Sequence, residues 1–172
     1  MTGLIDQPIR KAYCRDLARK LLKDHAISRL PVPVEKIAQE EGFTIEYIEG
    51  ESDKFCGILH RKLKAIGINS SHPRVRGRFS IAHELGHFFL EHPQEDDSTD
   101  SDEEREEWRI CESEANEFAG ELLVPKDVLE AQCDKLKNNP IDRVIQTLAG
   151  LFEVSRDVLI IQLTKHRLLM KL

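Results

Sequence analysis

The run His83-Glu84-Leu85-Gly86-His87 constrains the fold of this chain more than any other feature of its sequence. Residues four apart lie one above the other on an α-helix, so a helix through this run brings two imidazoles to one metal ion. Glu84 then projects beside them, toward the water that such an ion carries. The run therefore predicts a helix that supplies two metal ligands, His83 and His87, and a general base, Glu84.

The residues around this run favour an amphipathic helix from about Arg76 or Phe79 to Leu90. Its apolar residues lie on the side opposite the two histidines: Ile81, Ala82, Leu85, Phe88 and Phe89. Gly86 lies near the histidine face, where a glycine costs about 1 kcal/mol relative to alanine, so we expect another backbone to approach closely there. The alternatives are a chance match and a histidine pair that stabilises a helix surface without metal.

A catalytic zinc needs a third protein ligand and an open position. A second helix is predicted from Glu107 to Val124, and within it Glu112 and Asn116 share a face because they are four apart. Asn116 is thus suited to hold a metal ligand by a hydrogen bond. Glu114 flanks the apolar stripe of this helix on its other side and is a rival ligand. Periodicity leaves the choice between the two acids open.

Acidic residues are concentrated between these two helices. Residues 94–107 carry a net charge of −8, which leaves +2 for the rest of a chain whose total is −6. We expect a solvated loop here, with Glu103 to Arg109 alternatively at the start of the next helix. Because a basic field is missing, direct binding to nucleic acid or to an anionic membrane is not expected.

The cysteine pattern and the length of the apolar runs indicate the cellular compartment. Cys14, Cys56, Cys111 and Cys133 form no C-x-x-C pair, and the first residues lack an apolar signal core. No apolar run approaches the roughly 18 residues that a membrane helix needs. A reducing cytoplasm with free thiols is therefore expected.

The remaining pattern predicts an α+β fold with helices around a small antiparallel β-sheet and a C-terminal helical pair. Further helices are expected over 9–25, 34–41, 127–137, 141–151 and 155–169, with Ser155 as an N-cap. Strands are expected over 43–48, 56–60 and 65–69, the last two as a hairpin. The final helical pair could contact DNA, but its apolar content fits packing or partner binding better.

Two blocks together resemble the ImmA/IrrE family of zinc metallopeptidases. They are Arg78-Phe-Ser-Ile-Ala-His-Glu-Leu-Gly-His and, downstream, Glu112-x-x-Ala-Asn-x-Phe-Ala-Gly-Glu-Leu-Leu-Val-Pro125. The resemblance implies a single zincin-like domain over residues 1–172. It also implies that Zn²⁺ is bound by His83, His87 and Glu112 with Asn116 in support, and that Glu84 is the base. The long acidic insert, 94–107, departs from the family pattern.

The resemblance also implies a function. Relatives cut or antagonise a helix-turn-helix repressor encoded beside them, in mobile genetic elements or stress responses. The chain is therefore expected to be a zinc-dependent metalloendopeptidase that cleaves a helix-turn-helix repressor or an antitoxin. The alternative is a non-proteolytic regulator, an anti-repressor or a toxin–antitoxin component, with a structural zinc.

Two parts of the mechanism stay open at this point. The oxyanion of a peptidase needs a further donor, for which five residues are candidates: His60, His72, His92, Tyr47 and Arg74. A peptide substrate could add to the exposed edge of either 56–60 or 65–69, held by main-chain hydrogen bonds.

Overall fold

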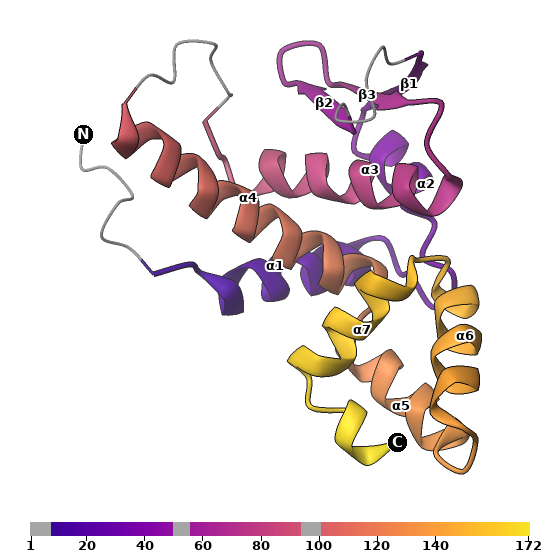
Figure 1. Ribbon diagram of the computed structural model, residues 1–172. Helices are drawn as coiled ribbons and strands as arrows, with labels where there is room; N and C mark the ends of the chain where they lie inside the picture. Colours follow the sequence, from indigo (N-terminus) through magenta and orange to yellow (C-terminus); the bar gives the residue numbers. More distant parts are fainter. Residues whose placement is uncertain (1–7, 50–55, 94–100) are drawn as a thin grey trace.

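Helices α3 (Arg74–Phe89) and α4 (Asp102–Leu123) cross at the centre of the molecule, and α1 (Lys11–Asp24) packs along α4 on the side away from α3 (Figure 1). The computed structural model describes residues 8–49, 56–93 and 101–172. The other helices are α2 (Val34–Glu40), α5 (Lys126–Leu136), α6 (Ile141–Phe152), α7 (Arg156–Lys165) and the short 3₁₀ turn η2 (Leu169–Lys171). The predicted α+β class, mostly helical with a small sheet, is confirmed.

The sheet has three strands in the order β1-β3-β2. Strands β2 (Gly57–His60) and β3 (Ala65–Asn69) form the predicted antiparallel hairpin. The expectation of an entirely antiparallel sheet is wrong, because β1 (Thr44–Ile48) runs parallel to β3. Strand β3 lies between the other two, so β1 and β2, which run in opposite directions, flank it. Helix α3 covers one face of this sheet (Figure 1).

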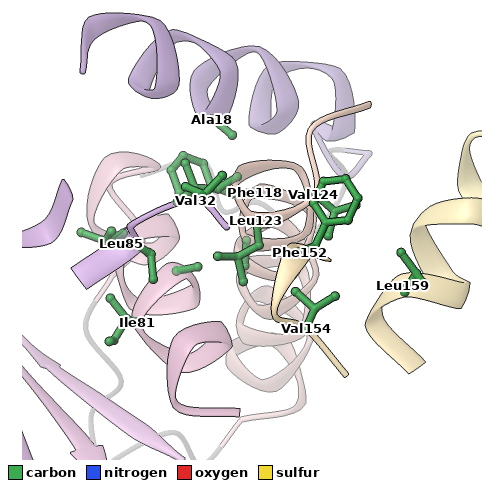
Figure 2. Packing of buried hydrophobic residues seen from close by; sticks show 14 of the residues in the cluster. Ala18, Val32, Ile81, Leu85, Phe118, Leu123, Val124, Phe152, Val154 and Leu159 are labelled. Carbon is green, nitrogen blue, oxygen red and sulfur yellow. The ribbon is translucent and has the colours of Figure 1, made fainter. Parts of the chain in front are cut away.

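The crossing of α3 and α4 depends on Gly86. A Cβ atom at this position would lie 3.1 Å from the Cα atom of Ala115 and 3.2 Å from its carbonyl oxygen. The close backbone approach expected from the sequence is therefore present. Buried side chains fill the space beside the crossing, including Leu85 and Phe118 (Figure 2).

Helix α4 begins inside the acidic stretch, so the alternative expectation, with Glu103 to Arg109 at the start of this helix, is confirmed, and a loop over the last part of 94–107 is wrong. Residues 94–100 lie outside the described residues. The hydroxyl of Ser101 accepts from the amide of Glu104, and the Glu104 carboxylate accepts from the amide of Ser101. This capping box is the S-x-x-E signature of a helix start. The acids of the first turn also interact favourably with the positive end of the helix dipole.

The C-terminal helical pair predicted from the sequence is formed by α6 and α7. Ser155 is the predicted N-cap of α7, and its hydroxyl accepts from the amide of Val158. Leu148, Phe152 and Leu163 of this pair are fully buried in the core. Within the described ranges, the helices are too short or too polar to cross a membrane.

We predict that Gly86→Ala destabilises the protein by about 1–3 kcal/mol, because the added methyl group meets backbone atoms of Ala115 that cannot move aside. Gly77→Ala, on the same helix, is the control. A Cβ there would meet only a side-chain atom of Ile68 at 3.5 Å, so this variant should gain helix propensity at no steric cost. Urea unfolding of both variants measures the difference, and equal stabilities would contradict the close crossing.

Candidate metal centre

Three side chains from α3 and α4 bring their ligand atoms together. The Nε2 atoms of His83 and His87 lie 2.9 Å apart. Oε1 of Glu112 lies 3.4 Å from the first nitrogen and 3.0 Å from the second. With bonds of about 2.0–2.1 Å, the ligands of a tetrahedral zinc ion lie roughly 3.3 Å apart, so the spacing of these three atoms is compatible with such an ion. Two imidazoles and one carboxylate are also a donor set that suits catalytic zinc.

Asn116 lies beside His83, one turn after Glu112. Its Oδ1 atom is 3.1 Å from Nδ1 of His83. An amide oxygen accepts hydrogen bonds, so Nδ1 of His83 donates, and the lone pair of this imidazole is left on Nε2. Asn116 therefore has the position that the sequence suggested for a residue supporting a metal ligand.

Glu114 points away from this cluster, toward α1. Its Oε1 atom accepts from the amide of Arg10 at 2.7 Å, and its Oε2 atom lies 2.6 Å from Nη2 of Arg10. Burial acts to raise the pKa of Glu114, but the hydrogen bonds from Arg10 and His92 hold it well below the ordinary value. The structure therefore brings Glu112, and not its rival Glu114, to the two histidines.

The pKa values of the two glutamates at the site, Glu112 and Glu84, shift in opposite directions. Burial acts to raise the pKa of Glu112, but its close contacts with the imidazoles of His83 and His87 lower it well below its usual range. Burial also raises the pKa of Glu84, and in this case the neighbouring groups do not outweigh it. Glu112 is thus held as a carboxylate, whereas Glu84 binds a proton more readily than an ordinary glutamate does.

Glu84 also lies next to the sheet. A Cβ atom at Gly57, the first residue of β2, would be 3.2 Å from Oε1 of Glu84. Among the described residues, β2 is paired only with β3, so it is an edge strand whose first residue lies beside this carboxylate.

Two residues around His87 were missed by the sequence reasoning. The indole of Trp108 stacks on the imidazole of His87, with ring centroids 5.3 Å apart and planes inclined by 13°. Trp108 precedes Glu112 by four residues, and this spacing could have placed both on one face of α4. The guanidinium of Arg61 donates to the main-chain carbonyls of His87 and His92. No local pattern indicates that contact, because it joins the hairpin turn to the end of α3.

The five candidate oxyanion donors have different surroundings. His92 is buried behind His87, with their Nδ1 atoms 3.1 Å apart. In the described parts of the chain, it is the one candidate that hydrogen-bonds to a histidine of the cluster. The others lie on the sheet or near the start of α3: Tyr47 on β1, His60 on β2, His72 before α3 and Arg74 at its first residue. His92 therefore supports the cluster from behind.

The chain is similar to known proteins in sequence and in fold. The family model for the IrrE N-terminal-like domain, Peptidase_M78, matches residues 42–164, which include both motif helices. A solved structure of a Mycobacterium tuberculosis transcriptional regulator has the same fold, with a TM-score of 0.61 and 16% sequence identity over 85% of this chain. The match spans 44% of that regulator. No curated protein matches the sequence.

Trp108 provides a test of the cluster, since it is the only tryptophan of the chain and stacks on His87. We predict that Co²⁺, an open-shell ion that suits the same ligands, quenches its fluorescence on binding, and that Zn²⁺ restores the emission by displacing Co²⁺. His83→Ala and Glu112→Ala should abolish the quenching. His60→Ala, which removes an exposed histidine on β2, should leave it unchanged. Undiminished quenching in His83→Ala and Glu112→Ala would show that the ion binds elsewhere.

Proposed function

The chain belongs to the IrrE N-terminal-like family of peptidases (M78), and from this premise we propose that it is a zinc-dependent metalloendopeptidase that cleaves a specific protein partner. The observation that carries the proposal is the position of Glu84, a partly buried carboxylate on the same helix turn as the two histidines of the cluster. A structural metal site needs its ligands but has no use for a general base.

In this proposal His83, His87 and Glu112 hold the ion. Bound Zn²⁺ would act as a Lewis acid that lowers the pKa of water and polarises a carbonyl. Asn116 keeps Nε2 of His83 free to bind by accepting from Nδ1. Trp108 restricts the rotation of the His87 ring by stacking on it. Both contacts fix the direction of a ligand lone pair.

Glu84 would carry the proton through the reaction. Its carboxylate accepts a proton from the attacking water and delivers it to the nitrogen of the departing amine. Burial favours this role because the raised pKa of Glu84 brings it closer to neutral pH, where a group can both accept and release a proton.

The outer edge of β2 is the proposed place for the substrate backbone. Of the two strands considered from the sequence, β3 is central and has both edges paired, so it cannot take up a peptide. The outer edge of β2 has main-chain groups free of β3, and Gly57 brings this edge next to Glu84 without a side chain between them. Main-chain hydrogen bonds hold a peptide of almost any sequence, so specificity would come from other contacts.

The partner we propose is a helix-turn-helix repressor or an antitoxin, whose cleavage would relieve repression. Support comes from the resemblance of the two motif blocks to a family that acts on such proteins. The fold shared with a transcriptional regulator from Mycobacterium tuberculosis agrees with a regulatory setting.

We predict that Glu84→Gln lowers peptide hydrolysis by about 10²–10⁴-fold, because the amide cannot accept the proton of the water. Zinc content should stay near that of the wild type, about one ion per chain, since this substitution removes no ligand. Hydrolysis is measured by mass spectrometry on a proteome-derived peptide library, and zinc by elemental analysis. Glu103→Gln, on the exposed first turn of α4, is the control and should cleave normally.

Two results would contradict this proposal. Equal cleavage by Glu84→Gln and the wild type would remove Glu84 as the base. If the zinc-loaded wild type cleaves no library peptide and no co-expressed repressor, yet binds the repressor with or without the Glu84→Gln change, the chain is instead a non-proteolytic regulator.

A further inference from the structure

Arg10, the residue directly before α1, and two arginines of α1 form ion pairs with three buried glutamates of α4. The pairs are Arg10–Glu114 at 2.6 Å, Arg15–Glu117 at 2.6 Å and Arg19–Glu121 at 2.7 Å. The three carboxylate side chains are 2%, 8% and 0% exposed. Lys165, the last residue of α7, pairs with Glu117 at 3.0 Å, and Nε2 of the next residue, His166, lies 3.6 Å from Oε2 of Glu121. The first pair is different because Glu114 also contacts His92, which lies against the metal cluster.

Two hydrogen bonds connect Glu114 to His87 through His92, and the donor and the acceptor of each can be assigned. Nε2 of His92 lies 3.1 Å from Oε2 of Glu114, and a carboxylate only accepts, so this nitrogen carries a proton. In a neutral His92 the other nitrogen, Nδ1, accepts. It lies 3.1 Å from Nδ1 of His87, which therefore donates. The lone pair of His87 is then on Nε2, the atom that faces His83 and Glu112.

The main chain fixes His92 in the position that this contact needs. After α3 ends, Glu91 adopts a left-handed conformation with a φ of 57°. The amide of His92 then donates to the carbonyl of His87 at 3.1 Å, and that of Glu91 to the carbonyl of Phe88. These bonds define a Schellman motif, in which the residue after the turn packs against the last full turn of the helix. Here the two residues in contact are both histidines.

Burial makes these contacts hard to replace. His87, His92 and Glu114 are 5%, 3% and 1% exposed. Water therefore has little access to any of the three, and the loss of one partner leaves a polar group of the next without a hydrogen bond.

We propose that Arg10, Glu114 and His92 form a positioning chain that orients His87 as a metal ligand. Arg10, at the N-cap of α1, precedes the residues 42–164 that the family model matches, yet through Glu114 and His92 it is connected to the metal centre. The inference rests on the proposed function, in which His87 binds the ion. None of the three residues touches the ion or the substrate.

The test is the zinc affinity of the full chain, measured by competition with a chromophoric chelator. We expect His92→Phe, which keeps a ring but removes both hydrogen bonds, to weaken binding by about 10–100-fold. Glu114→Gln should weaken it less, because an amide can satisfy His92 or Arg10 but not both. Arg10→Met is the mildest change, since this arginine is partly exposed, and it keeps the test valid if His92→Phe does not fold.

The matched controls are Glu117→Gln and Arg15→Met. They remove a buried ion pair between the same two helices, so they measure the cost of such a loss to stability. Zinc affinity should remain that of the wild type. A second readout is the visible absorption of the Co²⁺-loaded protein, which reports ligand orientation. It should shift in His92→Phe and stay unchanged in Glu117→Gln.

The outcomes separate this inference from the proposed function. If the wild type binds zinc and the variants of Arg10, Glu114 and His92 bind it as tightly as the two controls do, the positioning chain is overturned while the metal site stands. If the wild type binds no zinc, both the metal site and the positioning chain are overturned. Weaker binding in these variants than in the controls supports the chain.

Discussion

The close crossing of α3 and α4 is the contact on which the candidate site depends. Gly86 and Ala115 meet at this crossing with almost no side chain between the helices. His83 and His87 flank Gly86 on one helix, and Glu112 and Asn116 flank Ala115 on the other. This crossing fixes how the two helices lie relative to each other, and with it the approach of Glu112 to the two histidines. Gly86 is unfavourable for an isolated helix, but it permits this crossing.

Helix α4 carries acids on two faces, and each face meets a different kind of partner. Glu112 turns to the histidines of α3, whereas Glu114, Glu117 and Glu121 turn to Arg10 and to two arginines of α1. A buried carboxylate without a partner would cost several kcal/mol, so these three acids need the arginines that face them. The charges of α4 therefore favour the packing of α1 on this side.

Local patterns predicted most of the fold and the core of the candidate site. The H-E-x-x-H helix, the hairpin, the Ser155 cap and the crowding at Gly86 depend on neighbours within a few residues, which a sequence displays. The parallel pairing of β1 with β3 depends on how the chain returns to the sheet between these strands, and the sequence pattern within each strand does not show this. The choice between Glu112 and Glu114 required the position of α1. His92 could not be assigned, because its contact with His87 arises from a left-handed residue at Glu91.

The position of α4 is set by contacts that do not involve the metal cluster. One is the crossing at Gly86, and the second is the row of ion pairs with α1. The third is at the far end, where a Cβ atom at Gly120 would lie 1.9 Å from Nε2 of the buried Gln162 of α7. Three separate helices thus restrain α4 along its length. Glu112 reaches the histidines because the polypeptide is packed in this way, so the geometry of the cluster is a property of the chain itself.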